Sequence, residues 1–206
     1  MDYRGPVEAL IPGVQGRVLG LLARAGTDLT MRGVADLAGV SPQQASVVIA
    51  KLVQLGVVER RDVPPASLVR LVADNLAAQA VRSIASLRRE AIDRLTELAS
   101  AIKPAPASLV VFGSFARGEA DTESDVDVLA VRPLGLPNDD DGWTEAIWTW
   151  TGAATTAVGN PVNLIEAAAE EIPGLLRRRG PSVWTDIVQD GIVLVGSPLE
   201  ELAEAA

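Results

Sequence analysis

The stretch that decides the fold is residues 112–131, which read FGSFARGEADTESDVDVLAV. Gly113 and Ser114 follow one apolar run, and Asp125 and Asp127 stand at the head of a second. Short apolar runs bounded by glycine and polar residues are typical of buried strands. Because alternate residues of a strand face the same side, the two aspartates are predicted to project together, next to the Gly-Ser turn.

These residue types suit a site for magnesium and phosphate. Mg²⁺ is a hard cation that takes one or two carboxylates together with substrate phosphates. Gly113 lets the backbone approach an anion closely, and Ser114 begins a predicted helix that offers a hydroxyl and free N–H groups to the same anion. Gly-Ser or Asp-x-Asp alone would be weak evidence. Joined at this spacing between two apolar strands, they form a specific pattern.

The pattern resembles the polymerase-β-like nucleotidyltransferase superfamily, in particular its minimal stand-alone members, over residues 105–196. The resemblance implies in-line attack on the α-phosphate of an NTP, with pyrophosphate leaving and two Mg²⁺ ions stabilising both oxygens. It implies that Asp125 and Asp127 are the catalytic metal ligands. It also implies a nucleotide-binding set that continues past the turn, consisting of Gly113, Ser114, Arg117 and Ser124.

The superfamily also uses a third carboxylate, on a later strand, to activate the acceptor hydroxyl. The matching strand here is residues 161–165, and the expected metal-ligand position holds Asn163. An amide takes no proton, and losing a general base typically costs about 10²–10⁴-fold in rate. Glu166 is nearby, but strand parity turns it away from the Asn163 face. Whether the chain is an active enzyme therefore stays open.

The N-terminal part has the pattern of a helix-turn-helix followed by a two-stranded ribbon. Ser41 and Pro42 form a strong helix start, after a tight turn at Gly39. Residues 29–71 resemble the MarR-like winged-helix regulators, which implies contact with double-stranded DNA. The alternative is a docking module without DNA contact, because fold alone does not fix function. The implied DNA-binding side chains are Gln43, Gln44, Ser46 and Lys51 on the recognition helix, with Arg60 and Arg61 leading into the wing.

Residues 75–102 predict one long helix, with apolar side chains at steps of three and four. This stripe is either the seam of a homodimer or the face of a connecting helix packed on its own domains, and dimeric relatives favour the seam. The segment KPAPA at 103–107 ends the helix. We therefore expect an α+β two-domain protein: a winged helix-turn-helix at 1–73, a connecting helix at 74–103 and an α/β nucleotidyltransferase domain at 104–206.

Composition excludes several classes of chemistry. The 206 residues contain no cysteine and no histidine, so disulfides, thiolate zinc sites and imidazole bases are ruled out. The net charge is −9, with most of the acid in residues 104–206, which leaves the N-terminal part free to approach phosphates. The beginning of the sequence and its apolar stretches predict a cytoplasmic protein without membrane contact. A basic run at 177–179 is typical of a solvated helix end.

Three functional hypotheses follow. The first is a Mg²⁺-dependent nucleotidyltransferase that binds NTP and moves a nucleoside monophosphate onto an unknown acceptor, such as a protein, coupled to a DNA-binding domain. The second is a transcriptional regulator whose nucleotidyltransferase domain is weak or inactive and only senses nucleotide. The third is a partner protein of the toxin–antitoxin type.

Overall fold

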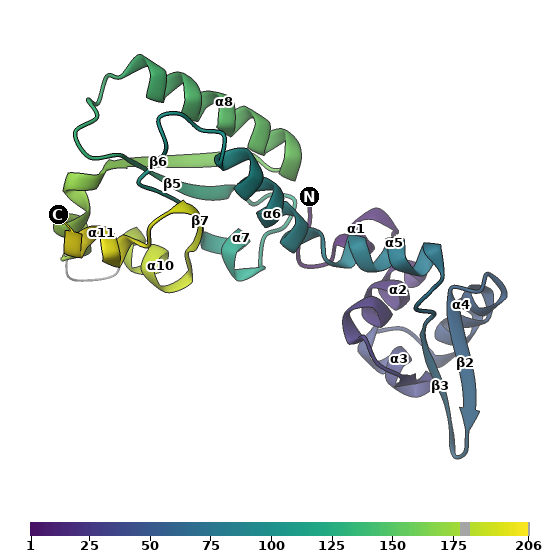
Figure 1. Ribbon diagram of the computed structural model, residues 1–206. Helices are drawn as coiled ribbons and strands as arrows, with labels where there is room; N and C mark the ends of the chain where they lie inside the picture. Colours follow the sequence, from purple (N-terminus) through teal and green to yellow (C-terminus); the bar gives the residue numbers. More distant parts are fainter. Residues whose placement is uncertain (178–181, 206) are drawn as a thin grey trace. The chain divides into compact units, whose positions relative to one another are not determined.

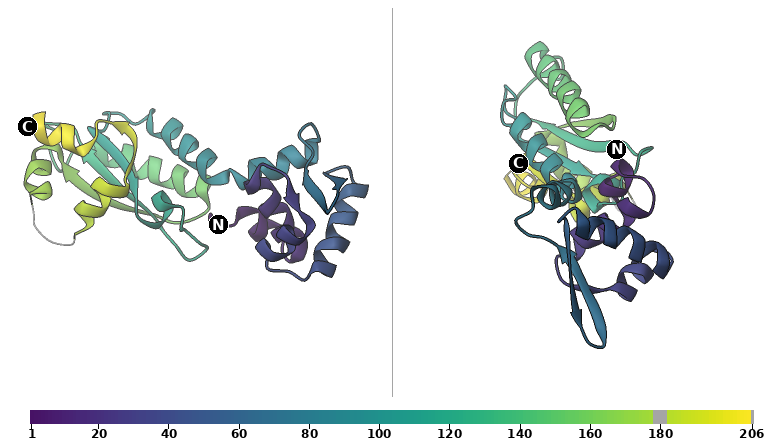
Figure 2. Two further views of the ribbon diagram at one scale, coloured as in Figure 1. Left: turned by 90° about the horizontal axis from the view of Figure 1, so that it is seen from below. Right: turned by 90° about the vertical axis from the view of Figure 1, so that its right-hand side faces the viewer.

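The computed structural model describes residues 1–177 and 182–205, and these divide into two compact units, each with its own helices and sheet (Figures 1 and 2). The N-terminal unit consists of Asp2 and Arg4–Leu87, and the C-terminal unit of Met1, Tyr3 and Arg88–Ala206. Two members of the predicted basic run, Arg178 and Arg179, lie outside the described residues. The mixed α+β class predicted from the sequence is confirmed.

The N-terminal unit is a winged helix-turn-helix. Thr30 caps the first helix of the motif by accepting a hydrogen bond from the Gly33 amide. Ser41 and Gln44 cap the second helix reciprocally, as the Ser-Pro start predicts. The elements in chain order are α1 Pro6–Leu10, α2 Val14–Ala25, β1 Leu29–Thr30, α3 Met31–Leu37, α4 Pro42–Gln54, β2 Val58–Val63, β3 Ala66–Leu71 and α5 Leu76–Ala85.

The wing is longer than the sequence predicts. Its antiparallel sheet has the order β1-β3-β2, and the short strand β1 was not predicted. The sequence predicts a strand over 57–60 and a loop over 61–65, but β2 extends to Val63, so that Arg61 as well as Arg60 lies in the strand, opposite Leu68 and Val69. The exposed polar residues at the end of β2 gave no sign of this extension, because only Val58 is buried.

The predicted single helix over 75–102 is wrong, because the structure divides it into α5 and α6 (Leu87–Ala99). The break falls at Ser86, whose hydroxyl donates to the Arg82 carbonyl oxygen at 2.7 Å. A serine that bonds back to the preceding turn competes with the regular helical ladder. The apolar pattern continues across this residue, so periodicity alone gave no sign of the break.

Several residues of the apolar stripe that predicts a dimer seam are buried within the chain itself. Leu95 is fully buried, and Ala91 and Ile102 are buried as well, whereas Leu76 is 81% exposed. The C-terminal half of the stripe therefore behaves as a helix packed on its own unit, which was the alternative to the seam.

The C-terminal unit is built on a four-stranded sheet of order β6-β5-β4-β7. The central strand β4 is antiparallel to both neighbours, and β5 and β6 run parallel. After α6, its elements are β4 Ser108–Phe112, α7 Gly113–Arg117, β5 Val126–Arg132, α8 Asp141–Val158, β6 Val162–Ala168, the 3-10 turn Ala169–Glu171, α9 Ile172–Leu176, α10 Val183–Asp190, β7 Ile192–Gly196 and α11 Leu199–Ala205.

Helices cover both faces of this sheet. Figure 1 shows α8 over one face, with α10 and α11 on the opposite side. The second face buries Leu129 and Val131 of β5 against Ile172, Ile187 and Leu199. Asp127 has the same strand parity as Leu129, so it belongs to this second face, near the N-terminal end of β5.

Among the described residues, no helix combines the length and the apolar character that crossing a membrane requires.

Candidate nucleotide site

The Gly-Ser turn and the second aspartate meet because β4 ends beside the start of β5. Phe112 is the register partner of Asp127, so the chain turns at Gly113 directly next to that carboxylate. Gly113 has φ of +72°, a conformation that disfavours any side chain. A Cβ at this position would lie 2.6 Å from Asp127 Oδ2, so any side chain here would be strained and would also displace that carboxylate.

Asn163 is the partner of Asp127 on the next strand. The two residues are in register across the parallel pair β5 and β6, and Asn163 Nδ2 donates to Asp127 Oδ1 at 3.0 Å. Asp125 is exposed and comes just before β5. Gly113, Asp127 and Asn163 are thus brought together, whereas Asp125 lies just outside the strand, two residues before Asp127.

Glu166 serves the opposite face of the sheet, as strand parity predicts. Its Oε2 accepts a hydrogen bond from Trp143 Nε1 at 2.9 Å and lies 3.6 Å from Arg132 Nη1. The carboxylate is therefore engaged with α8 and β5, on the side away from Asn163. It does not replace the missing third acid.

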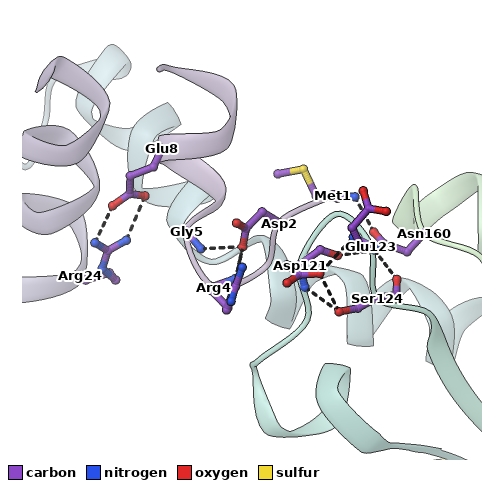
Figure 3. Close-up of polar contacts among 10 residues, drawn as sticks. All are labelled: Met1, Asp2, Arg4, Gly5, Glu8, Arg24, Asp121, Glu123, Ser124 and Asn160. Atoms are coloured by element: carbon purple, nitrogen blue, oxygen red, sulfur yellow. Dashed lines mark hydrogen bonds and ion pairs between the residues drawn. The ribbon is translucent and has the colours of Figure 1, made fainter. Parts of the chain in front are cut away.

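Ser124 is engaged in the loop that precedes Asp125. Its hydroxyl donates to Asp121 Oδ1 and accepts from the Asp121 amide, both at 3.0 Å. Asn160, only 1% exposed, donates from Nδ2 to the carbonyl oxygens of Asp121 and Ser124 at 2.9 and 2.8 Å. The backbone nitrogen of Met1 donates to Asn160 Oδ1 at 2.6 Å (Figure 3). These bonds fix the loop from which Asp125 emerges.

Sequence reasoning missed Asn160, because an asparagine between a helix-ending glycine and a proline looks like an ordinary turn residue. Its burial and its long-range partners appear only when the chain is folded.

The two remaining predicted residues of the site are Arg117 and Ser114, and Arg117 is already paired with acidic side chains. Arg117 is paired with Glu119 at 2.9 Å and with Asp190 at 3.4 Å, and the hydrogen bond that its Nε donates to Glu119 raises the pKa of the guanidinium further above its usual value. Ser114 is half-buried on α7, directly after Gly113. Two neighbouring carboxylates therefore already balance the charge of Arg117.

Magnesium is the metal that the sequence predicts here, and the donor set suits a site that a nucleotide completes. Within the described residues, no group of three or more acidic, histidine or cysteine side chains could hold a metal ion by itself. Asp125 and Asp127 supply two carboxylates, and Mg²⁺ commonly takes its other ligands from substrate phosphates and water. Asn163 could add its amide oxygen by turning the group that now donates to Asp127.

The candidate DNA-reading surface is the exposed side of α4. Gln43, Gln44, Ser46 and Lys51 are all exposed. The side-chain oxygen of Gln44 accepts from the Ser41 amide at 3.0 Å, so part of this residue is used in capping the helix. The other three side chains point to solvent from a well-capped helix.

The wing arginines have local partners. Arg60 donates from Nε and Nη2 to Asp62 Oδ1 at 3.1 and 3.0 Å, and from Nη2 to Ser67 Oγ at 3.0 Å. Hydrogen bonds from Ser67 and Arg60 lower the pKa of the Asp62 carboxyl, so this partner stays charged at neutral pH. Arg61 is paired with Asp28. Neither arginine is an unopposed cation.

With this geometry established, comparison with protein families assigns both units. Residues 11–67 match the MarR family, and residues 89–172 match the nucleotidyltransferase domain. The fusion predicted from the sequence is thereby confirmed. The second match includes Gly113, Asp127 and Asn163, so the cluster described above lies within the nucleotidyltransferase domain.

Two solved structures are similar to part of the chain. One is a toxin–antitoxin crystal structure with AMP-PNP, at 19% identity and a TM-score of 0.38. The other is a mutant of the toxin–antitoxin pair MntA–HpeT, at 18% identity and the same TM-score of 0.38. Each match covers 55% of this chain and 82% of the other. Comparison with curated proteins gave no significant match.

Proposed function

We propose that the nucleotidyltransferase domain binds an NTP with Mg²⁺ at Gly113, Ser114, Asp125 and Asp127, and transfers a nucleoside monophosphate slowly. The observation that carries this proposal is the approach of the Gly113 backbone to Asp127, which leaves no room for a Cβ. A turn that can bind phosphates therefore lies next to a carboxylate that can hold magnesium. Phosphoryl transfer requires the phosphates and the metal to be held close together in this way.

Each residue has a separate task in this proposal. The backbone of Gly113 and the hydroxyl of Ser114 bind phosphate oxygens, while Asp125 and Asp127 hold the metal. When bound, Mg²⁺ supplies charge neutralisation at the phosphates and at the departing oxygen. Asn163 orients Asp127 through the 3.0 Å hydrogen bond from its amide. In this arrangement the magnesium–nucleotide complex is bound, but no general base lies beside it to activate the acceptor.

The reaction balances without any further reagent. An acceptor hydroxyl oxygen forms a bond to the α-phosphorus, the bond from that phosphorus to the bridging oxygen breaks, and pyrophosphate leaves. The hydroxyl proton passes to solvent, because the amide of Asn163 cannot accept it. Without a general base, the expected rate is about 10²–10⁴-fold below that of a site with a third carboxylate.

Binding and transfer are tested together. Equilibrium dialysis with each of the four NTPs measures binding with Mg²⁺ and with EDTA, and α-labelled NTPs report transfer to proteins and nucleic acids of a cell lysate. We expect Mg²⁺-dependent binding that Asp125→Ala and Asp127→Ala abolish, with weak labelling by the unaltered protein. Glu123→Ala is the control, since Glu123 is an exposed acid of the preceding loop. Binding that survives both aspartate substitutions would exclude this site.

A second function is supported by the exposed face of α4. We infer that the MarR-family unit binds double-stranded DNA through Gln43, Ser46 and Lys51, and that nucleotide binding regulates this contact. Fluorescence anisotropy on DNA fragments from upstream of the gene measures the affinity with and without Mg·NTP. Unchanged retention by Lys51→Ala at moderate salt would argue against DNA contact through α4.

A further inference from the structure

The helix α7, which carries Gly113 and Ser114, is too short to be stable alone. It has five residues, whereas isolated helices shorter than about 12–15 residues are marginal in water. Its position beside Asp127 therefore depends on the side chains that hold it from outside. Two residues distant in the sequence, Arg88 and Tyr3, do so.

Arg88 holds the end of α7. Its Nε donates to the Phe115 carbonyl oxygen at 2.9 Å, and its Nη2 donates to the Ala116 carbonyl oxygen. The Phe115 carbonyl also accepts from the Gly118 amide at 3.1 Å, so Arg88 adds a second donor to it, and a cation near the last carbonyls of a helix also suits the helix dipole. A Cβ on Gly118, which ends α7 with φ of +78°, would lie 3.6 Å from Arg88 Nε. The planar guanidinium thus contacts the last turn of α7 at two carbonyls and lies next to Gly118.

Tyr3 holds the buried side of α7. Its ring meets the ring of Phe115 edge to face, with centroids 4.8 Å apart. Its hydroxyl donates to the Val158 carbonyl oxygen at 2.7 Å, and its amide donates to the Ala120 carbonyl oxygen at 2.9 Å. One side chain therefore ties α7 to the end of α8 and to the loop that leads to Asp125.

We propose that Arg88 and Tyr3 are positioning residues of the nucleotide site, which set the place of Gly113 and Ser114 through α7. The inference rests on the proposed nucleotide binding. Neither residue needs to touch the nucleotide. The clearance between Gly113 and Asp127 is so small that a slight shift of α7 changes what the turn and the carboxylate can bind together.

The chain supplies a matched control for Arg88. The next residue, Arg89, is exposed, and it makes no ion pair within residues 1–177 and 182–205. Arg89→Ala removes the same charge at nearly the same place without touching α7. Arg88→Lys keeps the charge but loses the planar fork that bonds two carbonyls at once. Tyr3→Phe keeps the ring contact and removes only the hydroxyl.

The experiment combines two readouts on the full chain, at a temperature where thermal unfolding shows every variant to be folded. Equilibrium dialysis gives Kd for Mg·ATP and the other three NTPs. Hydrogen exchange followed by mass spectrometry gives the protection of residues 113–119. For Arg88→Ala we expect at least a tenfold rise in Kd and faster exchange. The effect should be partial for Arg88→Lys, small for Tyr3→Phe and absent for Arg89→Ala.

Two results would overturn the inference. One is unchanged exchange at residues 113–119 in Arg88→Ala, which would show that Arg88 does not fix α7. The other is faster exchange with an unchanged Kd, which would reduce Arg88 to a stabilising role. An unaltered protein that binds no NTP would instead refute the proposed function, and the exchange data would still decide whether Arg88 holds α7.

Discussion

The candidate nucleotide site and the wing differ in whether their charged side chains already have partners. In the nucleotide site, Asp125 is exposed and takes no hydrogen bond from the part of the chain described, and Asp127 has only the neutral amide of Asn163 as a side-chain partner. In the wing, Arg60 and Arg61 are each paired with an acid of the same unit. Charged residues that the sequence shows equally clearly therefore differ in whether their charge is available to a ligand.

This difference affects how readily each group of side chains can bind an ion of opposite charge. Carboxylates that lack a cationic partner gain an opposite charge when a metal ion binds, which favours their ionised form. Paired arginines must first give up a partner before they contact a phosphate, which lowers their net contribution. We therefore expect α4, rather than the wing, to make the stronger contact with DNA.

The largest test of this comparison adds an acid to the nucleotide site. Asn163→Asp places a third carboxylate in register with Asp127 and supplies the missing base. We expect the melting temperature to fall in EDTA, because like charges then face each other, and to rise with Mg²⁺. We also expect NMP transfer to increase by about 10²–10⁴-fold. Calorimetry and α-labelled NTPs measure these two effects.

Asn163→Ser is the control for that substitution, since it removes the amide without adding charge. It should weaken the orientation of Asp127 and leave transfer slow. If Asn163→Asp and Asn163→Ser behave alike in Mg²⁺ dependence and rate, Asn163 does not face the metal.

A second test removes the close approach that defines the site. Gly113→Ala forces a side chain into a positive-φ position and against Asp127 Oδ2. We expect a loss of about 1–3 kcal/mol of unfolding free energy from the strained backbone, together with a loss of NTP binding. Urea unfolding and equilibrium dialysis give the two quantities.

Gly152→Ala is the matched control, because Gly152 lies in the middle of α8 with nothing near its Cβ position. It should stabilise the protein by about 0.5–1 kcal/mol and leave binding unchanged. A Gly113→Ala protein that binds NTP as well as the Gly152→Ala protein would contradict the shared position of turn and carboxylate.

A third test uses pH to probe the support beneath the site. Burial raises the pKa of Tyr3 from its usual 10.0 to about 12. The unfolded chain releases this proton first, so the stability that Tyr3 contributes is complete below pH 10 and is lost as the pH rises toward 12. The slope is about 1.4 kcal/mol per pH unit. Urea unfolding between pH 9 and 12 should show this decline, and Tyr3→Phe should flatten it. An equal decline in both proteins would mean that Tyr3 ionises freely.

The comparison also shows what the sequence could and could not predict. Asp127, Gly113 and the strands that bring them together follow from local spacing, because strand parity and a turn act over a few residues. The pairing of Arg61 with Asp28 and the contact of Arg88 with α7 join residues far apart in the chain, and no local pattern encodes them. Ser86 likewise marks a break in a helical pattern whose periodicity continues, and its side-chain hydrogen bond does not by itself account for the break, because Thr96 and Thr151 make the same bond inside continuous helices.

The smallest effect is expected in the wing, where pairing makes the predicted DNA contacts weak. Asp62→Ala removes the acid that accepts two of the three hydrogen bonds donated by Arg60. The freed guanidinium should then raise the affinity for a random-sequence duplex and steepen the dependence of log K on log salt by about one unit.

Lys51 is exposed and has no ion pair within the described residues, so Lys51→Ala should reduce the slope by about one unit. Arg60→Ala should change little, because its charge is already balanced in the unaltered protein. If Arg60→Ala lowers the affinity as much as Lys51→Ala, the wing gives up its internal pairs on binding, and the contrast between the two regions holds only for the protein without its ligands.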